Sequence, residues 1–124
     1  MTVEKMRDYL YHLPEQFAES LKMEFDFAGD YRSAYENIVV TGLGGSAIGG
    51  DILRTFALQK ASIPVVVNRD YNIPAFVGEK TLFYAVSYSG NTEETLSAYR
   101  QARERGAAIV CFSSGGELEK MARL

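Results

Sequence analysis

Apolar residues in the first 27 positions recur at spacings of three and four, the repeat of one face of an α-helix. The residues on this face are Val3, Met6, Leu10, Leu13, Phe17 and Leu21. Pro14 interrupts the pattern, because proline disfavours the α conformation of the preceding residue and suits the first turn of a new helix. We therefore predict two helices, over residues 2–12 and 14–27, and then a loop at Gly29 and Asp30.

From residue 37 onward, short apolar runs alternate with amphipathic segments. The predicted strands are residues 37–41, 64–67, 81–86 and 107–112. Predicted helices follow the first, third and fourth strands, with Gly106 as a C-cap for the helix over 93–104. The first of these helices has one apolar face, made by Ile48, Ile52, Leu53, Phe56 and Ala57. Such alternation predicts an α/β fold, in which a parallel sheet is flanked by helices on both faces and an N-terminal helical arm precedes it.

A glycine-rich stretch follows the first predicted strand and opens the next predicted helix. Five glycines fall among the nine residues 42–50. Glycine permits positive φ angles and lets a ligand approach the main chain closely, and free N–H groups at a helix start favour an anion. Three interpretations are open at this point: a tight turn without a ligand, a dinucleotide-binding loop, and a phosphate-binding loop.

The dinucleotide interpretation depends on two features. Gly42, Gly44 and Ala47 match the pattern G-x-G-x-x-A, and Asp70 follows the second predicted strand. Asp70 lies 28 residues beyond Gly42, whereas roughly 20 residues are usual for this fingerprint. A nucleotide P-loop is excluded, because the chain has no Gly-Lys-Ser or Gly-Lys-Thr sequence.

A second polar cluster, Ser-Tyr-Ser-Gly-Asn-Thr at residues 87–92, follows the apolar run 81–86. Parallel strands end at one edge of a sheet, so the two loops converge on one cleft if their strands are neighbours. Hydroxyls and helix N-termini there suit a phosphate. The competing role is capping, in which Asn91 is the N-cap of the next helix and Glu94 its N3 residue. The candidate phosphate-binding residues are Gly44, Gly45, Ser46, Ser87, Ser89 and Thr92.

Composition excludes several classes of protein. A net charge of −3 with scattered Lys and Arg does not support a nucleic-acid stripe or a polybasic membrane patch. The single cysteine, Cys111, excludes a disulfide within one chain and fits a reducing cytosol. No apolar run approaches the roughly 18 residues of a membrane span, and the N-terminus is too charged for a signal peptide. We expect a cytoplasmic globular chain without metal or cofactor.

The two motifs together, GLGGSAIGGD at 42–51 and SYSGNTEET at 87–95, resemble the sugar isomerase (SIS) domain. More narrowly, the chain is similar over nearly its whole length to the bifunctional phosphoglucose/phosphomannose isomerase family. The resemblance implies a flavodoxin-like three-layer sandwich. Members are similar to two SIS domains in tandem, so we expect an N-terminal part: a helical arm over 1–30 and a truncated SIS domain over 31–124. It also implies that substrate, chiefly its phosphate, is bound by Gly45, Ser46, Ser87, Ser89 and Thr92.

The implied reaction interconverts glucose 6-phosphate, and mannose 6-phosphate, with fructose 6-phosphate. It needs a base that carries a proton between C2 and C1 and an acid that opens the ring. In the family a glutamate and a histidine in the second half do this work. The only histidine here, His12, is expected to be a helix-end residue, and no glutamate has a histidine near it among Glu36, Glu79, Glu93 and Glu94. We assign no catalytic residue and expect the chain to be inactive alone.

Two other functions stay open on the sequence. One is a stand-alone sugar-phosphate binding or regulatory module, as SIS domains also serve in transcription regulators; the other is a dinucleotide-binding oxidoreductase domain. A partial α/β sheet exposes apolar surface, so we expect a homodimer or association with the missing C-terminal half. Hydroxyl loops recognise phosphate and not the stereochemistry at C2, so the sequence does not select among hexose phosphates.

Overall fold

The computed structural model describes residues 2–20, 22 and 34–124. The chain divides into two units, Met1–Arg32 and Ser33–Leu124, and each is described by itself. In the described part of the chain, no helix combines the length and apolar character that crossing a membrane requires.

The first unit contains one continuous helix, α1 (Val3–Ser20), with Pro14 inside it. The predicted break at residues 12–14 is therefore wrong. Proline removes one hydrogen bond to the carbonyl of Leu10, but its fixed φ of about −65° is also that of a helix. The amphipathic sequence on both sides carries the helix through, and the N-terminal helical arm is confirmed. Of the predicted continuation over 21–27, only Lys22 is described, in a turn.

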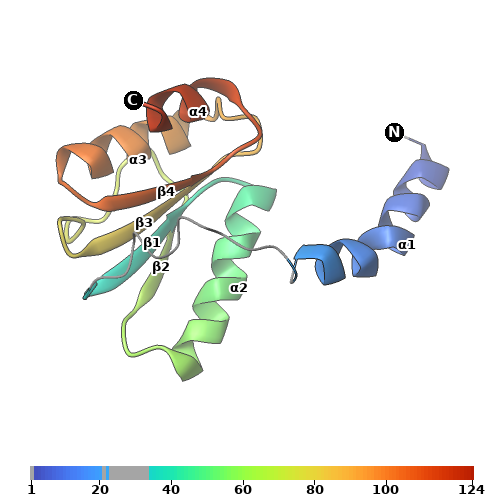
Figure 1. The fold of residues 1–124 in the computed structure, drawn as a ribbon, viewed down its shortest axis with the longest axis horizontal. Coiled ribbons are helices and arrows are strands. Elements are labelled where there is room, and N and C mark those ends of the chain that lie inside the picture. The colour runs from blue at the N-terminus through green and yellow to red at the C-terminus, as the bar shows by residue number, and fades with distance from the viewer. Residues whose placement is uncertain (1, 21, 23–33) are drawn as a thin grey trace. The chain divides into compact units, whose positions relative to one another are not determined.

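The second unit is built on a parallel sheet in the order β2-β1-β3-β4 (Figure 1). Its strands are β1 (Asn37–Thr41), β2 (Val65–Asn68), β3 (Thr81–Val86) and β4 (Ala108–Phe112). Each differs from its predicted range by at most one residue at either end, because short β-branched runs bounded by turn residues define strands clearly. β1 pairs directly with β3, and Thr41 lies opposite Ala85, which confirms that these strands are neighbours.

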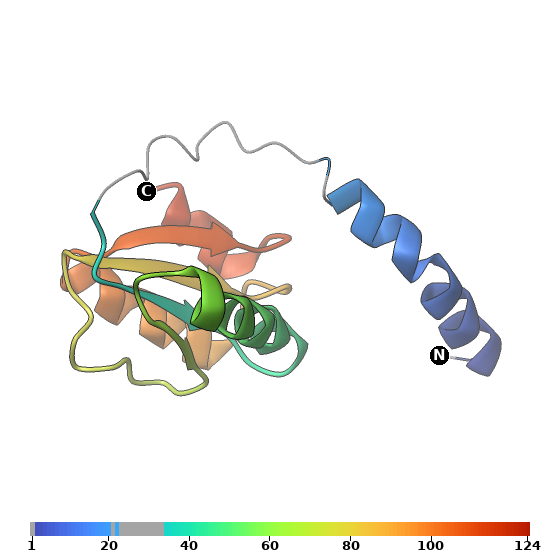
Figure 2. The ribbon, with the colours of Figure 1, turned by 90° about the horizontal axis from the view of Figure 1, so that it is seen from below.

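Helices cover both faces of the sheet, as predicted (Figure 2). α2 (Gly45–Lys60) lies on one face, and α3 (Glu93–Glu104) and α4 (Gly116–Ala122) lie on the other. Successive side chains of each strand point to opposite faces of the sheet and so contribute to two separate cores. The larger core lies under α3 and α4 and includes Val39, Phe83, Ala85, Leu96, Tyr99 and Leu118. The smaller core lies under α2 and includes Val40, Ala57 and Val65.

The predicted apolar face of α2 is only partly the face that packs on the sheet. Ile48, Ile52 and Phe56 are 56%, 62% and 63% exposed, whereas Ala57 is buried. The reason is the close approach at Gly50, where an added Cβ would lie 2.9 Å from Cγ1 of Val40. Small residues bring α2 down onto the sheet, and of the predicted face only Leu53 and Ala57 pack on the smaller core.

The 12-residue connection between β2 and β3 is held by the helix that follows. Ile73 and Val77 are buried in the larger core. The carbonyl of Tyr71 accepts hydrogen bonds from Ser97 Oγ at 3.0 Å and from Gln101 Nε2 at 2.7 Å. These contacts fix the start of the connection against α3, before it runs to the amino end of β3.

Candidate phosphosugar site

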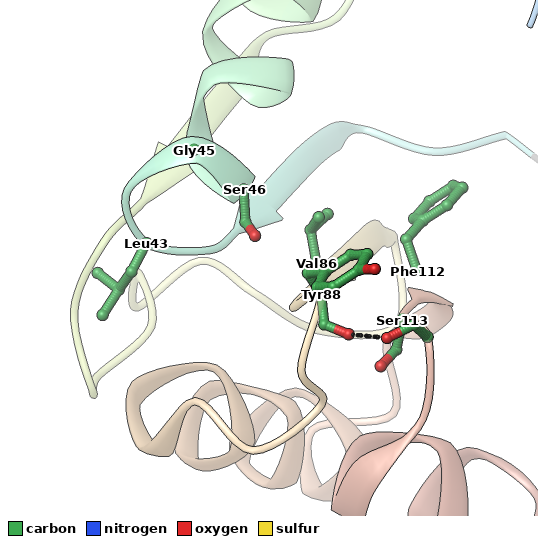
Figure 3. A pocket seen from close by; sticks show the side chains of 8 residues that line it. Leu43, Gly45, Ser46, Val86, Tyr88, Phe112 and Ser113 are labelled. Atoms are coloured by element: carbon green, nitrogen blue, oxygen red, sulfur yellow. Dashed lines mark hydrogen bonds between the residues drawn. The ribbon is translucent and has the colours of Figure 1, made fainter. Parts of the chain in front are cut away.

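Three turns meet at the carboxyl edge of the sheet, because β1, β3 and β4 all end there. They are residues 42–44 before α2, 87–92 before α3 and 113–115 before α4. A hollow of about 620 Å³ lies between them (Figure 3). Its lining residues are Leu43, Gly45, Ser46, Val86, Tyr88, Phe112, Ser113 and Ser114.

The first turn passes close to the end of β3 and leaves open space above its own backbone. A Cβ at Gly42 would lie 3.1 Å from the carbonyl oxygen of Val86, so glycine permits this approach. Gly44 has φ 54°, a conformation that other residues rarely adopt, and it precedes the first residue of α2, Gly45. A Cβ added at either Gly44 or Gly45 would meet no atom within 4 Å. A ligand can therefore reach the N–H groups of Gly44 and Gly45, where the helix dipole favours an anion. The N–H groups of Ser46 and Ala47 already donate to the carbonyls of Leu43 and Gly44, both at 3.1 Å.

The hydroxyls of the second turn already have partners within the turn. Ser87 is buried, with 1% of its surface exposed. Its Oγ lies 2.9 Å from Oγ1 of Thr92 and accepts the N–H of Gly90 at 3.1 Å. Ser89 Oγ accepts the N–H of Asn91, also at 3.1 Å. These bonds shape the turn, and a ligand that uses the same hydroxyls would share or displace them.

The structure brings only part of the predicted residue set to the hollow. Gly45 and Ser46 line it, and the Ser46 hydroxyl is directed toward the end of β3 in Figure 3. The other four predicted residues belong to the same turns but are not among the lining residues: Gly44, Ser87, Ser89 and Thr92.

Sequence reasoning missed the lining residues Tyr88, Ser113 and Ser114. The two-residue alternation of β3 was the available signal for Tyr88, because it extends past the end of the strand. Ser87 continues the buried positions Phe83 and Ala85 on the α3 side, so Tyr88 faces the hollow instead. For the serines, the signal was their place directly after β4, at the same edge of the sheet.

The predicted capping role of Asn91 is wrong. Thr92, not Asn91, is the N-cap of α3. The side-chain oxygen of Asn91 accepts the backbone N–H of Glu117 at 3.0 Å, so Asn91 serves the start of α4 instead. Glu93 is directed to the β2–β3 connection, where its Oε2 accepts the hydroxyl of Tyr71 at 3.1 Å. That bond raises the pKa of Tyr71, together with the negative charge of Glu94.

The residues that line the hollow carry no charged side chain. Arg69, just after β2, pairs with Asp51 of α2. The Asp70 carboxylate accepts its neighbour's N–H, that of Tyr71, at 2.6 Å. Any anion in the hollow would therefore be held by N–H groups, hydroxyls and the helix dipole. Among the described residues, no group of His, Cys, Asp or Glu is arranged to hold a metal ion.

His12 lies inside α1 and not at a helix end as expected, because α1 continues through Pro14. Its Nδ1 is 3.3 Å from Oε2 of Glu15, and both side chains are exposed.

Residues 31–123 match the family model described as the SIS domain. The chain is 49% identical over 118 residues to a bifunctional phosphoglucose/phosphomannose isomerase of Caldicellulosiruptor bescii, covering 94% of this chain and 35% of that protein. A protein of the same name from Thermoplasma acidophilum is 47% identical over 110 residues, covering 86% of this chain and 34% of its own length. The chain thus spans about a third of the length of these relatives.

Solved structures show the same fold. The C-terminal domain of glucosamine-fructose-6-phosphate aminotransferase from Francisella tularensis aligns with a TM-score of 0.71 at 20% identity, covering 93% of this chain and 36% of that one. The Vibrio vulnificus NanR protein, solved in complex with ManNAc-6P, aligns with a TM-score of 0.59 at 26% identity, covering 71% of this chain and 35% of that one.

Proposed function

We propose that this chain, which belongs to the SIS domain family, is the phosphosugar-binding part of an aldose–ketose isomerase that interconverts glucose 6-phosphate and mannose 6-phosphate with fructose 6-phosphate. The observation that carries the proposal is the hollow where Gly45 and Ser46, at the start of α2, face the turns after β3 and β4. The likeness to bifunctional phosphoglucose/phosphomannose isomerases over 94% of the chain supports the substrate class.

The phosphate would sit at the start of α2. Open space above Gly44 and Gly45 admits it to the main-chain N–H groups, and Ser46 adds a hydroxyl donor. Ser87, Ser89 and Thr92 would complete the site by donating their O–H groups to phosphate oxygens, while Ser87 and Ser89 go on accepting the N–H groups of Gly90 and Asn91. Only the hydrogen bond between the Ser87 and Thr92 hydroxyls would be replaced by a bond to phosphate, so the number of hydrogen bonds does not fall and the change costs little free energy.

The sugar would extend from the phosphate over the other half of the hollow. Val86, Tyr88 and Phe112 offer apolar and aromatic surface there, and Ser113 and Ser114 offer hydroxyls. Few polar groups in a mostly apolar hollow are typical of small-molecule sites.

The proton transfers would be supplied from outside this chain. On α1, His12 lies beside Glu15, and both side chains are exposed. We propose that residues 1–30 form the arm and 31–124 the phosphosugar-binding domain of a longer cytoplasmic enzyme. The acid and base would come from its remaining part.

The test is calorimetric titration of the chain with fructose 6-phosphate, followed by NAD. We expect fructose 6-phosphate to bind, and the S46A variant to bind it about tenfold more weakly, as expected for a lost hydrogen bond to a charged group. S62A is the control, because Ser62 is an exposed serine in the turn before β2 and lies outside the hollow. Binding of NAD without fructose 6-phosphate, or equal affinities of S46A and S62A, would contradict the proposal.

A stand-alone sugar-phosphate binding or regulatory module is the second candidate. The likeness to NanR, which was solved in complex with ManNAc-6P, makes ManNAc-6P the discriminating ligand. We expect an isomerase part to bind fructose 6-phosphate more tightly than ManNAc-6P, and a stand-alone module similar to NanR to show the reverse order.

A further inference from the structure

The turn after β3 is fastened to the turn after β4 by hydrogen bonds that the proposed function does not use. Ser114 donates its N–H to the carbonyl of Tyr88 at 3.0 Å, and Leu118 donates its N–H to the carbonyl of Gly90 at 2.9 Å. Next to the second of these bonds, the side-chain oxygen of Asn91 accepts the N–H of Glu117 at 3.0 Å. The three hydrogen bonds join residues 88–91 to residues 114–118.

We propose that Asn91 is a positioning residue for the phosphosugar site. Its side-chain amide latches the turn 87–92 to the start of α4 and so holds both turns in the shape that accepts the ligand. This inference deepens the proposed function and rests on it. Asn91 is not among the residues that line the hollow. It would affect ligand binding indirectly, by holding Ser87–Thr92 and Ser113–Ser114 in place.

The two turns are in main-chain contact, which makes the latch effective. A Cβ at Gly90, where φ is 75°, would lie 1.7 Å from the carbonyl oxygen of Gly115. A Cβ at Gly116, where φ is 72°, would lie 2.4 Å from the carbonyl oxygen of Ser89 and 2.8 Å from Oδ1 of Asn91. Neither turn can shift without the other at this separation, so a bond between them restrains both.

The latch also connects the two parts of the candidate site. On one side, Gly90 donates its N–H to Ser87 Oγ, which pairs with Thr92. On the other, Ser114 donates its N–H and its Oγ to the carbonyl of Tyr88, and both residues line the hollow. Loosening the bond at Asn91 therefore disturbs the predicted phosphate hydroxyls and the opposite wall together.

The binding test compares N91A with N37A. Asn37 also accepts a hydrogen bond through its side-chain oxygen, from Thr81 Oγ1 at 2.6 Å, but at the opposite, amino edge of the sheet. Both variants lose one amide acceptor, so both report the general effect of that loss. We expect N91A to bind fructose 6-phosphate about fivefold more weakly than the unaltered chain, the factor that one net hydrogen bond is worth, and N37A to bind it unchanged.

Amide hydrogen exchange tests the latch without any ligand. N91A should exchange the Leu118 amide about fivefold faster than the unaltered chain does, because the bond beside it is lost. N91D keeps an oxygen acceptor at the same place and should restore the slow exchange. If N91A is too unstable to study, N91Q replaces it, because the longer side chain carries the amide oxygen away from the Glu117 N–H, and it should weaken fructose 6-phosphate binding in the same way.

The outcomes separate the two proposals. If the unaltered chain does not bind fructose 6-phosphate, the proposed function fails, whatever the exchange rates. If the unaltered chain binds but N91A binds equally well, or N91A and N37A lose affinity by the same factor, the positioning role is overturned. Unchanged exchange of the Leu118 amide in N91A overturns the latch itself.

Discussion

The side-chain oxygens of Ser87 and Thr92 lie 2.9 Å apart and join the end of β3 to the first residue before α3. Ser87 Oγ also accepts the N–H of Gly90, so one buried hydroxyl closes the whole turn. The turn therefore has its shape before any ligand arrives, and a phosphate would meet hydroxyls that are already held in place. Preorganisation of this kind reduces the entropy lost on binding.

Replacing Ser87 with alanine should lower the free energy of unfolding by about 1–3 kcal/mol, because the Gly90 N–H and the Thr92 hydroxyl both lose their partner. S89A should lower it by less than about 1 kcal/mol, since Ser89 is exposed and water can replace its oxygen. Urea titration followed by circular dichroism measures both changes. Equal losses for the two variants would show that burial of the Ser87 hydroxyl is unimportant.

Thr95 offers a stabilising substitution. Its Oγ1 is buried in α3 and is the one such side-chain atom, among the described residues, that has no hydrogen-bond partner. Valine has the same shape and removes the unsatisfied group, so T95V should raise the free energy of unfolding by about 1 kcal/mol. The control is T41V, because Thr41 is equally buried but exchanges hydrogen bonds with Asn68. T41V should lower the same quantity by about 1–2 kcal/mol, and a thermal melt that shifts both variants in one direction would contradict this reasoning.

Two adjacent glycines in α2 should respond oppositely to alanine. At Gly49 an added Cβ would meet no atom within 4 Å, so G49A gains helix propensity and should raise the free energy of unfolding by about 0.5–1 kcal/mol. At Gly50 the Cβ would lie 2.9 Å from Val40 Cγ1, so G50A should lower it by about 1–3 kcal/mol. Urea midpoints of the two variants on either side of the unaltered chain would bear this out. A gain for G50A would mean that α2 does not pack closely on the sheet.

The strands and their neighbour relation could be predicted because each is a short apolar run that ends in turn residues. The continuity of α1 could not be predicted, because whether a helix tolerates Pro14 depends on the strength of the flanking sequence and not on the proline alone. The apolar pattern also did not predict which face of α2 packs on the sheet. Phe56 fits an apolar stripe, but the contact at Gly50 decides which side of the helix meets the sheet.

In the candidate site, too, some features could be predicted from the sequence and others could not. That Gly45 and Ser46 lie at the hollow was predictable, because the turn before α2 follows a parallel strand and so lies at the carboxyl edge of the sheet. The partners of Ser87 and Asn91 were not, because they depend on how closely the turns after β3 and β4 approach. That distance is set by Gly90 and its contact across the turns, and no local pattern reports a contact between segments 25 residues apart, from Gly90 to Gly115.

Cys111 gives a prediction that involves pH. It lies in β4, half-buried against the larger core, and burial raises the pKa of its thiol from 9.0 to about 11. At pH 8 the thiolate fraction should therefore be about 100-fold lower than that of an unperturbed thiol, and alkylation by iodoacetamide slower by about the same factor. Because the folded pKa is the higher one, the thiol stabilises the fold fully below pH 9, and that contribution is lost as the pH rises toward 11.

Unfolding in urea should restore the ordinary rate of alkylation at Cys111, and C111A should show no reaction with iodoacetamide. A folded chain that reacts at pH 8 within about threefold of its urea-unfolded form would contradict the raised pKa.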